Sequence, residues 1–231
     1  ARFHYNGRDE FSKIRALKLF GQWQNLWEKR LEQLEAAWRS VVMNHPGNEF
    51  ETLFADSFPY YAGLAENAIQ YFRDTLIDYL PGSLDVPTVC HNHYSPETWG
   101  GAVVWKNPFD WVVDHPARDL AEYARSLFFR GSKVYMNPLR NFIQDYQGST
   151  PLTAFGWRLL YSRLLLPLHY FRCVEGYYLH PDTNEILPLI KNLKGITDQS
   201  DDYEAFLKDF WEVCGVPARS MQIKMPEWIS G

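Results

Sequence analysis

A short stretch that begins at Val89, VCHNHYSPETW, gathers residue types that can do chemistry. His91 and His93 lie two positions apart, and Cys90 directly precedes the first of them. A second stretch, NPFDWVVDHPARDLAEY, supplies further histidine and carboxylate side chains: Asp110, Asp114, His115 and Asp119. Histidine and carboxylate together can bind a transition metal such as zinc or manganese. Metal-dependent hydrolysis is therefore one candidate chemistry.

Each of these residues also has a simpler explanation. A His-x-His pair is a weak metal signal without a third ligand at a known spacing. Cys90 and His91 are adjacent on a predicted strand, so their side chains point to opposite faces and do not form a nucleophile–base pair. Asp119 near the start of a helix is stabilising for capping and dipole reasons alone. His91 can simply bond a backbone carbonyl.

The order of the motifs is more informative than any one residue. A strand leads into the loop HNHYSPET at 91–98, a short hairpin follows, then FDW at 109–111, and then a helix that starts PARDLA at 116–121. This order resembles the catalytic half of the aminoglycoside phosphotransferase and choline kinase-like superfamily, whose members are relatives of the protein kinases. The opening ARFH is similar to the end of the LA-x-x-H helix that follows the nucleotide lobe in this superfamily.

Three further features narrow the resemblance to one group. They are the long helices before the loop, the sequence DHPARDLAEY at 114–123 and the many aromatic residues. These are most similar to the spore-coat kinase-like group of endospore-forming bacteria, of the CotS and YutH type, and within that group to YutH. The resemblance implies a location in the spore coat, with other spore-coat proteins as partners.

The resemblance also implies roles for individual residues. Phosphoryl transfer needs an aspartate that orients the attacking hydroxyl, and an asparagine and a second aspartate that hold magnesium on the nucleotide phosphates. Here His93 stands at the position of the catalytic aspartate and Thr98 at that of the metal-binding asparagine. Asp110 matches the magnesium-binding aspartate. His91 matches the histidine that supports the loop, and Asp119 the helix-start aspartate that braces it.

Two of these residues, His93 and Thr98, differ from the types that phosphoryl transfer requires. A histidine can accept a proton near neutral pH, but it supplies no fixed negative charge at position 93. The hydroxyl of Thr98 is a weak neutral ligand for a hard magnesium ion. We therefore expect a degenerate pseudokinase with a structural or assembly role and no cofactor. The alternatives are an active small-molecule phosphotransferase that uses MgATP with atypical metal ligands, and a His/Asp metal-dependent hydrolase.

The expected fold class is mainly α, or α+β, as in the C-terminal lobe of the protein-kinase-like fold, with long helices around a small β-hairpin region. Residues 1–231 form one such lobe: a helical insertion at about 9–80, a catalytic-loop region at about 84–130 and C-terminal helices at about 134–231. Hydrophobic periodicity predicts a first helix from Asp9 to about Trp38 and a second from Glu51 to Tyr79, interrupted near Pro59. Short strands are predicted at 86–90 and 102–105, and further helices at 116–129, 137–146, 152–178, 185–193 and 203–214.

No Gly-rich phosphate loop and no lysine-bearing strand precede Trp23 in this sequence. The nucleotide lobe of the superfamily is thus absent from this chain. Because the sequence starts inside a helical motif, we expect such a lobe to precede Ala1 in the full-length protein.

Composition limits the remaining function classes. The chain has 231 residues, of which 46% are hydrophobic and 16% aromatic, so it can bury a sizeable core. A formal net charge of −5 argues against nucleic acid as a partner. The longest apolar run, around Leu159 to Leu168, is broken by Arg163 and Pro167 and is too short to span a membrane. Three widely spaced cysteines are typical of a soluble protein made in a reducing compartment. The sequence predicts no oligomeric state.

Overall fold

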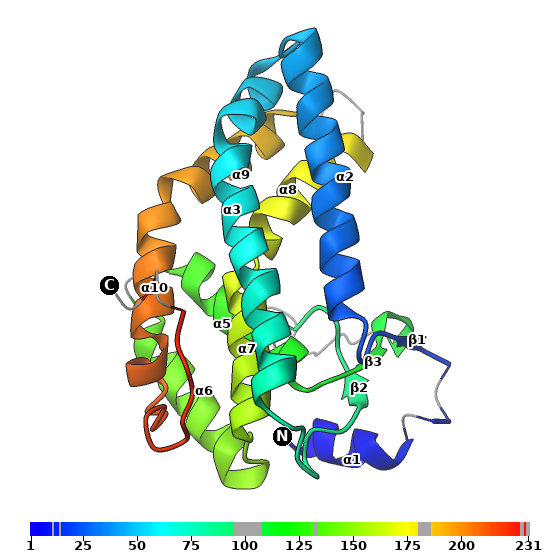
Figure 1. Cartoon of the computed structure of the whole chain (residues 1–231), viewed down its shortest axis with the longest axis vertical. Coiled ribbons are helices and arrows are strands. Elements are labelled where there is room, and N and C mark those ends of the chain that lie inside the picture. Colours follow the sequence, from blue (N-terminus) through cyan, green and yellow to red (C-terminus); the bar gives the residue numbers. More distant parts are fainter. Residues whose placement is uncertain are drawn as a thin grey trace, which may run out of the picture.

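The computed structural model describes residues 1–10, 12–13, 15–94, 108–131, 134–179, 186–226 and 229. Helices make up most of this part of the chain, and a small three-stranded sheet lies beside the N-terminal helix at one end of the molecule (Figure 1). The prediction of a mainly helical α+β fold is confirmed. Of the two predicted strands, the one at 102–105 lies outside the described residues.

The sheet has the order β1-β3-β2. Strand β1 (Leu17–Lys18) runs parallel to β3 (Val112–Asp114), and β2 (Thr88–Cys90) runs antiparallel to it. Both β2 and β3 are buried along their whole length. The sheet therefore holds the two segments that sequence analysis singled out side by side, with Val89 opposite Val113.

Helix α1 (Arg2–Glu10) packs directly on β2, and this contact depends on one glycine. A Cβ atom on Gly7 would lie 2.6 Å from Oγ1 of Thr88 and 2.9 Å from the backbone nitrogen of Val89. The Thr88 hydroxyl in turn donates a hydrogen bond to the carbonyl of His4 at 2.6 Å. Any larger residue at position 7 would push α1 away from the strand.

The first two long helices form an antiparallel pair along one side of the molecule (Figure 1). They are α2 (Trp23–Asn44) and α3 (Glu49–Asp78). The prediction of one helix starting at Asp9 is wrong, because α1 ends at Glu10 and the chain then forms β1 before α2 begins. The amide groups of Leu19 and Phe20 both donate to the carbonyl of Val113, so tertiary pairing with β3 overrides the helical pattern here.

Helix α3 also differs from its prediction, because it continues through Pro59. A proline removes the N–H that would bond to the carbonyl four residues earlier, which is Ala55. The indole Nε1–H of Trp38, on α2, donates to that carbonyl at 3.0 Å. The neighbouring helix thus supplies the hydrogen bond that Pro59 cannot make.

Six helices complete the described chain: α5 (Ala117–Arg130), α6 (Met136–Ser149), α7 (Ala154–Leu165), α8 (Leu168–Leu179), α9 (Ile186–Asp198) and α10 (Ser200–Val213). All six positions were predicted, but 152–178 was predicted as one helix. The chain breaks at Leu166, whose backbone is extended because a residue before proline disfavours the helical region.

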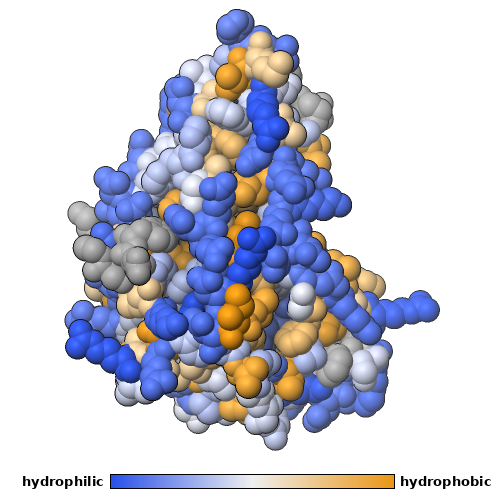
Figure 2. Space-filling model, viewed as in Figure 1, coloured by the Kyte–Doolittle hydropathy of each residue, from blue (hydrophilic) through white to orange (hydrophobic). Residues whose placement is uncertain are grey.

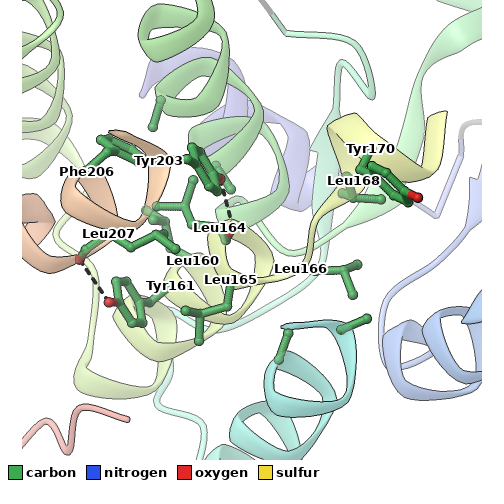
Figure 3. Close-up of a cluster of buried hydrophobic side chains, with 14 of the residues drawn as sticks. Leu160, Tyr161, Leu164, Leu165, Leu166, Leu168, Tyr170, Tyr203, Phe206 and Leu207 are labelled. Carbon is green, nitrogen blue, oxygen red and sulfur yellow. Dashed lines mark hydrogen bonds between the residues drawn. The ribbon is translucent and has the colours of Figure 1, made fainter. Parts of the chain in front are cut away.

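The main hydrophobic core lies between these helices and the α2–α3 pair, and every residue of α7 after Ala154 is buried. Figure 3 shows one cluster of this core around α7. The C-terminal carbonyls of α7 need partners from outside the helix. The hydroxyl of Tyr203 donates to the carbonyl of Leu164 at 2.8 Å, and the guanidinium of Arg125 donates to the carbonyls of Arg163 and Leu166. Tyr161 makes a similar bond to the carbonyl of Leu207 at 2.9 Å (Figure 3).

Hydrophilic side chains cover much of the face seen in Figure 2, with smaller hydrophobic areas between them. Among the described residues, no helix is long and apolar enough to cross a membrane.

Candidate functional site

The candidate loop leaves the sheet at the end of β2. Its first residue, His91, is buried, and the next, Asn92, has a φ of 64°. This left-handed conformation is one that asparagine tolerates better than most residues. It turns the chain so that His93 is exposed, with its amide 2.7 Å from the carbonyl of His91.

Asp119, at the start of α5, holds the first residue of this loop in place. Its Oδ2 atom accepts two hydrogen bonds from His91, one from the backbone amide and one from Nδ1, both at 2.8 Å. The same oxygen accepts a third hydrogen bond, at 3.0 Å, from Nε2 of His4 on α1. The loop cluster, which we define as His4, His91 and Asp119, is buried.

The protonation of the loop cluster follows from its surroundings. Burial would raise the pKa of Asp119, but the hydrogen bonds and charges of His4 and His91 hold that pKa well below its usual range. Burial lowers the pKa of His4, which favours the neutral ring. A neutral His4 donates from Nε2 to Asp119 and accepts at Nδ1 from the Tyr146 hydroxyl, 3.0 Å away. The cluster is thus an ionised carboxylate surrounded by donors.

These hydrogen bonds join α1, the loop and α5, and the loop-supporting role that the resemblance implies for His91 and Asp119 stays a prediction. The loop cluster also meets the geometric requirement for three metal ligands, because one atom from each residue lies within 4.8 Å of the others. The ligand set does not fit magnesium, which prefers oxygen atoms, and Nε2 of His4 and Nδ1 of His91 are already hydrogen-bonded to Asp119. We interpret the cluster as a structural brace between α1, the loop and α5.

The other predicted histidines and carboxylates are distributed over separate contacts. Asp114 accepts hydrogen bonds from the Trp23 indole and from Nε of Arg118, at 2.8 and 2.5 Å. His115 lies 3.3 Å from Oδ1 of Asp85. Among the residues that the structure describes, the loop cluster is the one group of three with metal-ligand spacing, so the predicted residues do not converge on one metal site.

Of the residues at the positions of the catalytic machinery, His93 and Asp110 are described, and both are exposed. Asp110 ends a 3-10 helix (Pro108–Asp110) just before β3, and its side chain is exposed. Thr98 lies outside the described residues. Cys90 is fully buried and burial raises its pKa well above the ordinary value, which agrees with the prediction that it is not a nucleophile.

Sequence reasoning missed two functional contacts. His4 was present only within the ARFH motif, and its spacing to the loop gave no sign of the contact with Asp119. Arg118 was not singled out, yet its Nη1 atom donates to Oδ1 of Asn92 at 3.0 Å while Nε binds Asp114. Its position one residue before Asp119, in a helix whose first turn is buried, is the signal that could have identified it.

Comparison with known proteins places these features in a family. Residues 1–210 match the family described as "Spore coat putative kinase YutH". The chain is 40% identical over 229 residues to the endospore coat-associated protein YutH of Bacillus subtilis (strain 168), and the match covers 99% of this chain and 67% of that protein.

The fold agrees with this sequence relationship. The structure is similar to the crystal structure of an aminoglycoside phosphotransferase from Alicyclobacillus acidocaldarius, with a TM-score of 0.67 at 16% sequence identity. The similarity covers 83% of this chain, which spans 58% of the phosphotransferase. It therefore shows a kinase-like fold. By sequence, the chain belongs to the YutH family of spore-coat kinase-like proteins.

Proposed function

We propose that this protein is a degenerate member of the kinase-like fold that acts in the spore coat as a structural or assembly factor. The proposal rests on the contrast between the loop cluster and the positions that would take part in phosphoryl transfer. The loop cluster is complete and buried, whereas the loop presents His93 where phosphoryl transfer calls for an aspartate.

Chemical considerations support this proposal. The attacking hydroxyl must be oriented by a fixed negative charge, and the neutral form of His93 has none while its protonated form repels magnesium. Thr98 replaces an amide ligand with a hydroxyl. Among the described residues, Asp110 is the one that matches a magnesium ligand of the superfamily, and a single carboxylate is a weak basis for holding MgATP.

The name of the B. subtilis relative supports a coat location for this protein, and with it other coat proteins as partners. Such a role needs a stable surface rather than a reacting centre. On this proposal the brace is retained because it holds α1, the loop and α5 together.

A genetic experiment tests the proposal. The chromosomal gene in the source organism is replaced by an Asp110→Ala variant or an Asp119→Asn variant, and the proteins of the purified spore coat are compared. A structural role predicts a normal coat with the exposed Asp110→Ala and an altered coat with the buried Asp119→Asn. A coat defect with Asp110→Ala, at normal protein level, would show that the role depends on a metal ligand and would reject the proposal.

One observation favours a second candidate, an active MgATP-dependent phosphotransferase. Asp110 is retained and its carboxylate is exposed, so it remains available to a metal–nucleotide complex. If this candidate is correct, MgATP should raise the melting temperature of the full-length protein and Asp110→Ala should abolish the shift. The absence of any shift at millimolar MgATP would count against it.

A further inference from the structure

A pocket of about 400 Å³ opens beside the loop, between α2, α5 and α8, and most of its charged side chains are basic. Its lining includes Asn92, which directly precedes His93. The basic side chains that line it are Lys29, Arg30, Arg118, Arg163 and Arg172, and Glu175 is the acidic one among the described residues. Arg30 and Glu175 form an ion pair with each other, so neither provides net charge to the pocket.

The guanidinium groups behind and beside the pocket outnumber the carboxylates that they contact. Arg125, Arg163 and Arg172 all bind the buried carboxylate of Glu122, at 3.2, 3.1 and 2.7 Å. Arg118 binds Asp114. Within this group of described residues, four guanidinium groups thus share two carboxylates, and two positive charges are not balanced.

Arg163 shows the imbalance most clearly. Its side chain is 3% exposed, and its buried Nε–H has no hydrogen-bond partner within the part of the chain that the structure describes. Its Nη2 atom reaches Glu122, and its guanidinium carbon lies 4.8 Å above the ring of Trp23. Burial, and then the nearby charge of Arg118, lower the pKa of Arg163 to about 9. An unpaired buried donor on a cation costs free energy unless a ligand satisfies it.

We propose that this pocket binds a small phosphorylated molecule, with the phosphate on Arg118, Arg163 and Arg172 and the remainder of the ligand against the apolar wall formed by Trp27 and Leu168. Guanidinium groups suit this role because their planar donor array matches phosphate oxygens. The pocket volume is sufficient for a compact metabolite. The proposal goes beyond the proposed function, because binding needs neither His93 nor Asp110.

Three probes separate the possible ligands in a calorimetric titration of the full-length protein: glucose 6-phosphate, inorganic phosphate and glucose. We expect glucose 6-phosphate to bind and glucose not to bind, with an affinity that falls as salt is added. Equal affinities for inorganic phosphate and glucose 6-phosphate would support the anion site and assign it to the free ion. Binding of glucose as tight as that of its phosphate, or no binding of either anion at millimolar concentration, would overturn the proposal.

Variants at the rim keep the test independent of folding. Arg172 is partly exposed, at 40% of its side chain, and Lys29 is exposed, so Arg172→Gln and Lys29→Gln should both fold. Arg172→Gln should weaken glucose 6-phosphate binding about tenfold, the typical effect of losing one charge-assisted hydrogen bond. Lys29→Gln should weaken it less, because it removes only a nearby positive charge. The matched control is Arg39→Gln on α2, which also removes one exposed positive charge but lies outside the pocket.

The control should bind like the wild-type protein. Unchanged affinity in both rim variants would contradict the proposal. Asp110→Ala distinguishes this site from a nucleotide site: glucose 6-phosphate binding that survives this change supports the proposal, and binding that is lost with it rejects a separate pocket.

Discussion

Nε2 of His4 lies 3.0 Å from Oδ2 of Asp119, and this contact joins α1 to the start of α5 across 115 positions of the sequence. The same oxygen also binds the amide and the ring of His91. Three separate segments thus meet at a single carboxylate atom. The remaining oxygen, Oδ1, is buried and has no hydrogen-bond partner among the described residues, so the hydrogen bonds of the brace all end on Oδ2.

Loss of the charge at the centre of the brace should be strongly destabilising. Asp119→Asn keeps the shape of the side chain but replaces an ionised acceptor of three hydrogen bonds with a neutral amide. We expect the free energy of unfolding to fall by about 3 kcal/mol, the scale for disrupting a buried charged network. Denaturant unfolding followed by circular dichroism measures it. Asp110→Asn, at an exposed carboxylate, is the matched control and should change stability by less than about 0.5 kcal/mol.

The same brace makes stability depend on pH. The pKa of His4 is lower in the folded protein than in the unfolded chain, so the unfolded chain binds more protons between the two values. The contribution of His4 to stability is therefore fully present above the ordinary histidine pKa of about 6.5. It is lost as the pH falls below that value, by up to about 1.4 kcal/mol per pH unit. The pKa of Asp119 is also lowered, so its contribution is lost at still lower pH, below about 4.

Unfolding curves at pH 5, 6 and 7 check this prediction. The free energy of unfolding should rise from pH 5 to pH 7, and His4→Gln should reduce the slope of that rise. The exposed His45→Gln is the control and should leave the slope as it is in the wild-type protein. An equal slope in the wild-type protein and in His4→Gln would show that the ring of His4 does not remain neutral on folding.

The packing of α1 on β2 predicts opposite effects for two glycine substitutions. Gly7→Ala places a methyl group against Thr88 and the Val89 backbone, and overpacking of this kind costs about 1–3 kcal/mol. Gly63→Ala, in α3, meets nothing within 4 Å and should stabilise the protein by up to about 1 kcal/mol through helix propensity. Thermal denaturation of both variants measures the difference. A stabilising Gly7→Ala would mean that α1 does not lie against β2.

The indole that compensates for Pro59 predicts an energetic coupling. Trp38→Phe should destabilise the wild-type protein by about 1 kcal/mol or more, because it leaves the carbonyl of Ala55 without a donor. In the Pro59→Ala background, the amide at position 59 can bond to that carbonyl, so the same substitution should cost less. A double-mutant cycle gives the coupling directly. Equal costs in the two backgrounds would show that the indole bond does not replace the helical one.

Much of the fold was predictable because its helices carry strong hydrophobic periodicity. The α5 helix was predicted almost to its ends, from its proline start and its apolar spacing. Strand β3 was missed because it has three residues and is defined by its pairing with β2, which no local pattern reveals. The continuity of α3 through Pro59 also depends on a distant side chain, Trp38.

The candidate site was predictable in part, from the order of its motifs. The motif order identified His91 and Asp119, whose contact is now visible, because both occur at fixed positions in a known pattern. The contribution of His4 comes from the packing of α1 on the sheet, and that of Arg118 and Arg163 from the meeting of α5 and α7. Contacts of this kind depend on tertiary structure and have no local signature.

The proposed loss of phosphoryl transfer is tested most directly by measuring magnesium-dependent ATP turnover by the full-length protein. We expect a rate at the background of the assay, with no difference between the wild-type protein and Asp110→Ala. A magnesium-dependent turnover in the wild-type protein that Asp110→Ala abolishes would contradict the proposed role, since it would mean that His93 and Thr98 still support the reaction.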